Sequence, residues 1–90
     1  MTEEWLIERG FNKVRVPRIE SDNPYDYYYY DKFFCSDITF YTTDSIDVVD
    51  NNWEIKCWEI PILTIKSPEH YDDFCNLVRI LIGDVYRETN

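Results

Sequence analysis

The side chains that perform most enzyme chemistry are sparse in this chain of 90 residues. His70 is the only histidine, and the three cysteines, Cys35, Cys57 and Cys75, are widely spaced. Nucleophilic catalysis needs a base beside the nucleophile, but Cys75 and His70 point in different directions on a helix. The two isolated glycines of the chain cannot build a phosphate-binding loop. We therefore expect a protein that is not an enzyme.

Carboxylates are abundant, but their spacing matches no metal site. Asp44, Asp47 and Asp50 recur at intervals of three and lack the turn glycine and terminal glutamate of a calcium loop. The cysteines form no CxxC pair of the kind found in zinc sites. With 18 acidic residues in the chain, close pairs of carboxylates arise by chance. We expect neither a metal nor a cofactor.

The charge balance favours some partners over others. The formal net charge is −9, from 18 Asp and Glu against nine Lys and Arg. Such a surface repels phosphate backbones and anionic membranes, so we expect no direct binding to nucleic acid or to a membrane. It favours a basic protein, including the positive clefts of nucleic-acid-handling factors. The absence of a signal peptide or long apolar segment predicts a cytoplasmic protein with reduced thiols.

The elements that must position these residues can be predicted from local patterns. Thr2 is placed to cap a helix that Gly10 ends, and Ser67 and Pro68 begin a longer helix with Gly83 at its end. Strands are expected at 12–17, 25–34, 38–42 and 53–60, with 62–65 as a last strand or an extended entry to the helix. Loops or turns are expected at 20–24, 35–37 and 43–52. The long helix carries an apolar stripe: Tyr71, Phe74, Leu77, Val78 and Leu81.

This pattern predicts one α+β domain spanning residues 1–90. Its sheet would hold three to five mainly antiparallel strands, with a short N-terminal helix and a longer C-terminal helix packed on it. Two independent cores would be too small to be stable in a chain of this length.

The segment PYDYYYYDKFF, residues 24–34, has three interpretations. Its tyrosines offer stacking surfaces for single-stranded bases, but that mechanism needs a positive groove, and Asp26, Asp31 and Lys32 do not supply one. A central strand with aromatic residues packed on both faces is the second. The third is a strand whose outer tyrosines bind another protein, since Tyr is enriched at interfaces.

The pattern WLIERGFNKV, YYYYDKFF, ITFYT and WEI resembles small acidic, uncharacterised proteins of phages and related mobile elements. Together with the acidity, it is similar to anti-defence proteins, including anti-CRISPR inhibitors and DNA mimics. The resemblance implies a non-catalytic protein that inhibits a basic host nucleic-acid-processing or defence factor by protein–protein contact. It carries no motif from which a family residue can be transferred.

On this hypothesis, carboxylates occupy positions that phosphates would take, and exposed tyrosines anchor the partner. The candidate partner-binding residues are Asp44, Asp47, Asp50, Glu54, Glu59, Tyr28 and Tyr30. One alternative is an immunity or antitoxin protein that neutralises a nuclease toxin by the same electrostatics. Another is a small phage protein with a ligand-binding or structural role. Each is compatible with a homodimer formed through the aromatic strand.

Overall fold

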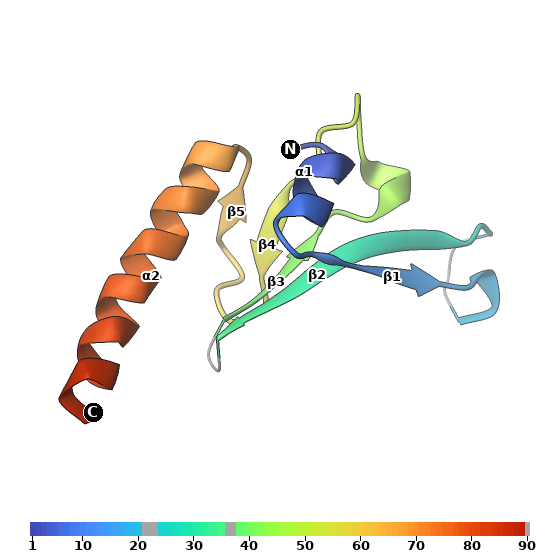
Figure 1. Ribbon diagram of the computed structural model, residues 1–90. Coiled ribbons are helices and arrows are strands. Elements are labelled where there is room, and N and C mark those ends of the chain that lie inside the picture. Colours follow the sequence, from blue (N-terminus) through green and yellow to red (C-terminus); the bar gives the residue numbers. More distant parts are fainter. Residues whose placement is uncertain (21–23, 36–37, 90) are drawn as a thin grey trace.

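The predicted α+β architecture is confirmed by the computed structural model, which describes residues 1–20, 24–35 and 38–89, and from residue 82 onward only the course of the backbone. Five antiparallel strands form one sheet in chain order (Figure 1). The strands are β1 (Asn12–Val16), β2 (Tyr27–Cys35), β3 (Ile38–Thr42), β4 (Ile55–Cys57) and β5 (Thr64–Ile65). The helices are α1 (Glu3–Glu8) and α2 (Pro68–Thr89), with short 3₁₀ turns η1 (Arg18–Glu20) and η2 (Ser45–Asp47). Parts of the turns predicted at 20–24 and 35–37 lie outside the described residues.

Helix α1 begins and ends where the sequence predicts. The Thr2 hydroxyl accepts a hydrogen bond from the Trp5 amide at 3.2 Å. After the helix, Gly10 has a φ of 88°, the left-handed conformation that glycine adopts without strain. The Phe11 amide then donates to the Leu6 carbonyl at 3.0 Å, and both side chains are buried. This end directs the chain into β1, which is an edge strand of the sheet.

One face of the sheet, which we call the inner face, carries the core. Its centre is Phe40, which is fully buried and lies between Phe11, Phe34, Tyr71 and Phe74, with ring centroids 5.4–6.3 Å away. Other buried members are Tyr30, Ile38, Ile55, Cys57 and Ile65. Edge-to-face and tilted ring pairs of this kind add to the burial of apolar area. The inner face therefore supplies most of the hydrophobic stabilisation.

A β-bulge in the β2–β3 hairpin decides which face of β2 becomes the inner one. Cys35 pairs with Ile38, but Phe33 pairs with Thr39, so the register shifts by one residue. Because side chains alternate along a strand, a shift of one residue exchanges the two faces. Lys32 consequently lies opposite Phe40 on the inner face, and Phe33 is on the other face, 69% exposed.

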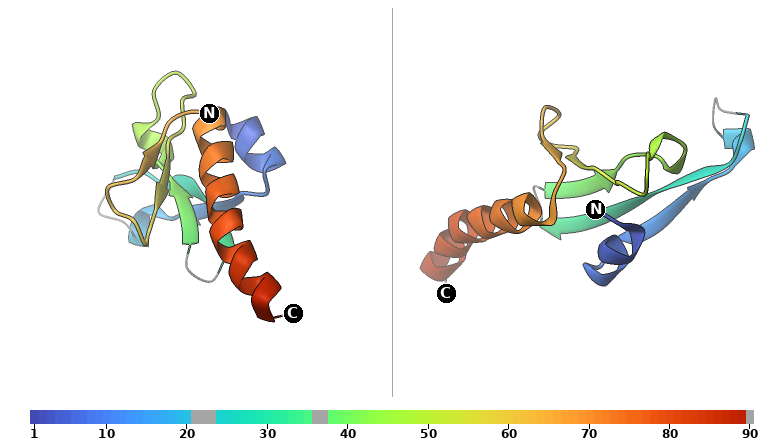
Figure 2. Two further views of the ribbon diagram at one scale, coloured as in Figure 1. Left: turned by 90° about the vertical axis from the view of Figure 1, so that its left-hand side faces the viewer. Right: turned by 90° about the horizontal axis from the view of Figure 1, so that it is seen from above.

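Helix α2 packs on the inner face with its first half only. The Ser67 hydroxyl accepts from the His70 amide at 3.2 Å, so the predicted N-cap is confirmed. Tyr71 and Cys75 are buried, and Phe74 and Val78 pack against the core. The rest of the helix extends beyond the sheet, as the two views of Figure 2 show.

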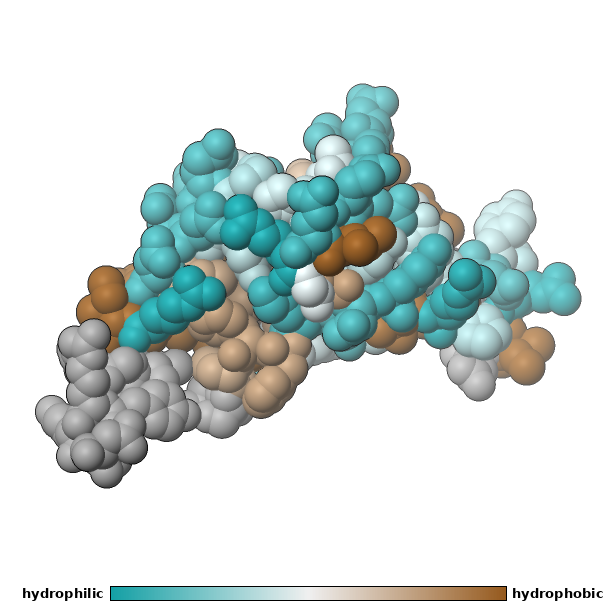
Figure 3. All heavy atoms as spheres, viewed as in Figure 1, coloured by the Kyte–Doolittle hydropathy of each residue, from teal (hydrophilic) through white to brown (hydrophobic). Residues whose placement is uncertain are grey.

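Two predictions about α2 are wrong. Leu77 and Leu81 are 55% and 62% exposed, because the sheet ends before the apolar stripe does. Figure 3 shows apolar surface along this part of the helix, whereas most of the visible surface elsewhere is hydrophilic. Gly83 does not end the helix, which continues to Thr89. A glycine inside a helix costs only about 1 kcal/mol, and no proline follows to enforce a stop.

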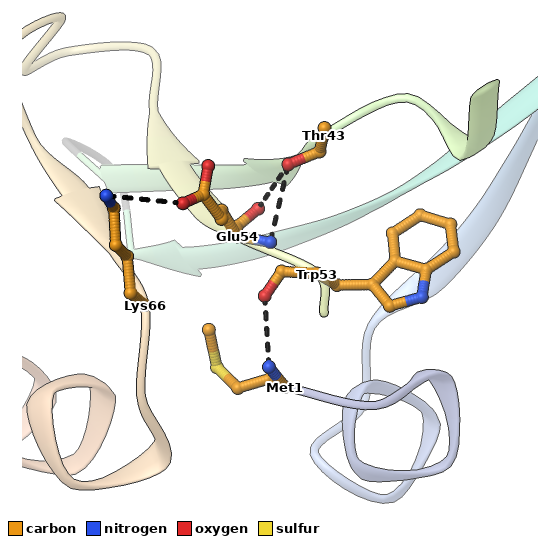
Figure 4. Close-up of polar contacts among 5 residues, drawn as sticks. All are labelled: Met1, Thr43, Trp53, Glu54 and Lys66. Carbon is orange, nitrogen blue, oxygen red and sulfur yellow. Dashed lines mark hydrogen bonds and ion pairs between the residues drawn. The ribbon is translucent and has the colours of Figure 1, made fainter. Parts of the chain in front are cut away.

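The segment between β3 and β4 is a loop, as predicted. It contains η2 and then a tight turn in which Asp50 and Asn51 both have positive φ, 53° and 58°. This is the type I′ pattern, for which Asp and Asn are well suited. The turn leads back to Trp53, whose amide donates to the Met1 carbonyl at 2.7 Å, and whose carbonyl accepts from the Met1 amino group at 3.1 Å (Figure 4). The first residue of the chain is thereby tied to the core.

Candidate functional site

The second face of the sheet, which we call the outer face, is covered by neither helix. The strand register places on it the apolar and aromatic residues Val14, Val16, Tyr27, Tyr29, Phe33 and Tyr41, together with the polar residues Asp31, Thr39, Lys56 and Thr64. Both helices pack on the inner face (Figures 1 and 2). Large apolar side chains left exposed in one region mark an interaction surface more often than isolated ones do. The outer face is therefore the candidate functional site.

A stacked pair of rings lies on the outer face. Tyr41 and Trp58 lie 4.0 Å apart between centroids, with an interplanar angle of 20°. Trp58 follows β4, and its amide donates to the Thr39 carbonyl at 3.1 Å. The indole remains 59% exposed. The pair presents a flat aromatic surface whose position is fixed by the backbone, so little entropy is lost when a partner packs on it.

Carboxylates flank the central tyrosine of the outer face. The pKa of Tyr29 is raised first by burial and then by the negative charges of Asp31 and Asp44. The pKa of Asp44 is itself raised, by burial and by Asp47, although Lys56 opposes the change. Asp31, which pairs with Tyr41 across β2 and β3, and Asp44 therefore act electrostatically on Tyr29, and Lys56 opposes the charge of Asp44. The outer face is thus aromatic and acidic together.

Of the seven predicted site residues, the structure brings Asp44 and Asp47 close enough together for the charge of Asp47 to raise the pKa of Asp44. Asp44 is half-buried and Asp47 is exposed. Asp50 is exposed but lies at the tip of the type I′ turn, so the three aspartates do not form one continuous row. A sequence spacing of three produces such a row on a helix, and this segment is only briefly helical.

Glu54 and Glu59 both have structural partners. Glu54 pairs with Lys66 at 3.6 Å, while its backbone bonds to the Thr43 hydroxyl (Figure 4). Glu59 accepts a hydrogen bond from the Thr39 amide at 2.7 Å, which lowers the pKa of its carboxyl group. The Glu59 carboxylate therefore holds the end of β3 and the turn that carries Trp58.

The prediction that Tyr30 is an exposed tyrosine is wrong, and Tyr28 is only partly exposed. Both lie on the inner side of β2, where Tyr30 is 2% exposed and Tyr28 is half-buried. The Tyr30 hydroxyl donates to a Glu3 carboxylate oxygen at 2.8 Å. Burial, followed by this hydrogen bond, raises the pKa of Tyr30 to about 12. The bulge described above is the physical reason, since it turns Tyr27 and Tyr29 outward instead.

The sequence prediction missed the exposed rings of Phe33 and Trp58 and the half-buried outer-face tyrosines Tyr27, Tyr29 and Tyr41. A partial signal was present, because Tyr27, Tyr29, Asp31 and Phe33 share one side of any strand at 25–34. What the sequence lacked was a reason to place that side outward.

Basic side chains are concentrated on the helix side of the molecule. Arg9 pairs with Asp72 at 3.2 Å and lies over the ring of Trp5. Lys13 lies 4.0 Å from the centroid of Tyr28. Lys32 donates to the Arg9 carbonyl at 2.7 Å and to the Tyr71 hydroxyl at 3.0 Å. These three basic side chains therefore already have partners on the helix side, away from the outer face.

The reactive residue types lie in ordinary structural environments. His70 is exposed in the first turn of α2. Cys57 and Cys75 are buried, and burial is the largest cause that raises the pKa of each thiol. Within the described ranges, no group of three or more His, Cys, Asp and Glu residues could hold a metal ion. Nor does the described part of the chain contain a helix long and apolar enough to cross a membrane.

A shallow hollow of about 520 Å³ lies beside the β3–β4 loop. Its lining is mixed, with five polar residues beside Val49 and Trp53: Thr43, Asp47, Asn52, Glu54 and Lys66. A ligand pocket is usually apolar with a few convergent polar groups. The hollow resembles the border of a protein interface more than such a pocket.

Comparisons with known proteins add no assignment. No family model, no curated protein and no solved structure matches the chain. The function is therefore inferred from the outer face itself.

Proposed function

We propose that the protein is a non-catalytic acidic binding protein, encoded by a phage or mobile element, which inhibits a basic host nucleic-acid-processing or defence factor by direct contact. The proposal places it in the host cytoplasm and in the class of anti-CRISPR-like inhibitors. The observation that carries it is the uncovered outer face, where the exposed rings of Phe33 and Trp58 share the surface with Asp31, and where Asp44 acts electrostatically on Tyr29.

Aromatic and acidic groups have separate roles in such an interface. Trp58 and Phe33, more than half exposed, supply apolar area that becomes buried on binding. Rings of this kind are typical energetic centres of interfaces. The carboxylates steer a basic partner during association and align it. A surface with both properties fits a nucleic-acid-binding cleft, which is basic and often contains stacking residues.

The structure favours a compact acidic patch over a long imitation of a phosphate backbone. Asp44 and Asp47 are close enough to influence each other, and Asp31 lies on the neighbouring strand. Asp50 is separated from them by the tight turn. We therefore place the contact on Asp31, Asp44 and Asp47, and not on the full predicted series.

A capture experiment in a host lysate tests the proposal. The tag belongs at the C-terminal end, because Met1 is buried and bonded to Trp53. We expect a basic nucleic-acid-handling protein to be enriched at low salt and to be lost as salt screens the contact. If only a toxin from the neighbouring operon is captured, the protein is an immunity protein instead. Failure to enrich any basic protein at low salt would contradict the proposal.

A further inference from the structure

The chemistry of the outer face can be compared with a site that already holds a cation in this protein. On the helix side, the Arg9 guanidinium lies 5.1 Å from the centroid of Trp5 and pairs with Asp72 at 3.2 Å. An aromatic ring and a carboxylate thus hold one guanidinium between them. The outer face offers the same two kinds of group, because Asp31 pairs with Tyr41 across β2 and β3, and Tyr41 stacks on Trp58.

Charge complementarity selects the kind of occupant. A second copy of the chain, docked by the same face, would set one acidic surface against another. Like charges brought together across an interface cost several kcal/mol. Phosphate groups would be repelled in the same way. Lys56 opposes the charge of Asp44, but its effect on that carboxyl group is smaller than those of burial and of Asp47.

The geometry of the aromatic groups favours arginine over lysine. The Tyr41–Trp58 pair is flat and its indole is 59% exposed, which suits the planar guanidinium group. Arginine also pairs with a carboxylate through two parallel hydrogen bonds, whereas the lysine ammonium acts as a compact and strongly hydrated charge. A partner surface rich in arginine would therefore use both features of the outer face at once.

We propose that the outer face recognises arginine side chains of its basic partner, which stack on Tyr29 and on the Tyr41–Trp58 pair and bond to Asp31 and Asp44. This inference rests on the proposed function and specifies the chemistry of the partner. The rings and carboxylates that would bind arginine are already held in position by the sheet, so binding requires no rearrangement of it.

Two synthetic peptides of equal length and charge test the inference. One carries arginine and the other lysine at the same positions, separated by glycine and serine, and each is labelled for fluorescence anisotropy at low salt. We expect the arginine peptide to bind about tenfold more tightly, as stacking and paired hydrogen bonds together require. The Trp58→Leu variant should lose most of this difference. The matched control is Tyr25→Leu, because Tyr25 is 69% exposed and outside the sheet.

The outcomes separate this inference from the proposed function. Equal, salt-sensitive binding of both peptides would overturn arginine recognition and leave a basic partner in place. Binding of neither peptide would also overturn it, while the lysate capture would still decide the proposed function. Sedimentation of the unliganded protein gives a further check. A dimer that Trp58→Leu dissociates would show that the occupant is a second copy, contrary to the inference.

Discussion

Replacing Tyr29 and Tyr30 one at a time tests which face of β2 is free. The two residues are adjacent and identical in type, so they differ only in the side of the sheet that they occupy. Tyr30 is 2% exposed, with its ring 5.3 Å from Trp53 and 6.1 Å from Tyr28. Tyr29 is half-buried and lies on the outer face.

The magnitudes follow from this difference in burial. Truncating a buried aromatic residue to alanine costs about 3–5 kcal/mol, because apolar contacts are lost and a cavity remains. We expect Tyr30→Ala to lose that amount, out of a total stability of about 5–13 kcal/mol for a domain of this size. Tyr29→Ala loses only contacts with sheet neighbours and should cost about 1 kcal/mol. Tyr30→Phe keeps the ring and removes the hydrogen bond to Glu3, for about 1 kcal/mol.

Urea unfolding followed by far-UV circular dichroism measures these differences without relying on the fluorescence of Trp53. The slope of the unfolding free energy with urea should stay constant across the variants, so that midpoints report stability alone. If Tyr29→Ala destabilises the protein as much as Tyr30→Ala does, the assignment of inner and outer faces is wrong. The outer-face site would then fail with it.

Two further predictions concern Glu59 and the cysteines. The Thr39 amide lowers the pKa of Glu59 below its usual value of 4.5. The ionised Glu59 carboxylate therefore stabilises the folded protein at pH values above 4.5, and this stabilisation is lost as the pH falls through the lowered pKa. The stability advantage of the wild type over Glu59→Gln should therefore shrink on acidification from pH 7, in urea midpoints measured at several pH values; a constant difference would contradict this role. A thiol reagent should modify the half-buried Cys35 first and reach Cys57 and Cys75 only on unfolding. Mass spectrometry can follow the order of modification. Early modification of Cys75 in the folded protein would contradict the described packing.

Local signals predicted the helix starts and the existence of the strands, although β4, at Ile55–Cys57, is much shorter than the strand predicted at 53–60. Thr2, Gly10 and Ser67 act through short-range hydrogen bonds and backbone angles, and their effects do not depend on distant parts of the chain. The alternation of Trp53, Ile55 and Cys57 was also sufficient, and all three are buried.

The face of β2 could not be predicted in the same way. An unshifted hairpin continuing the Cys35–Ile38 pairing would have placed Phe33, and with it Tyr27 and Tyr29, beside Phe40 in the core. The bulge reverses this arrangement and depends on packing by both helices. The prediction for the C-terminal part of α2 was wrong for a related reason. Periodicity shows an apolar stripe, but it does not show where the supporting sheet ends.

The affinity of the captured partner for two double variants tests the central claim most directly. Asp31→Lys with Asp47→Lys reverses two charges at the outer face. Glu8→Lys with Asp73→Lys makes the same change in net charge at exposed positions on the two helices. We predict that the first pair weakens binding at least tenfold at low salt, since each reversal replaces attraction with repulsion. The second pair should have a much smaller effect. Equal weakening by both pairs would show that net charge alone attracts the partner, and would contradict a binding site on the outer face.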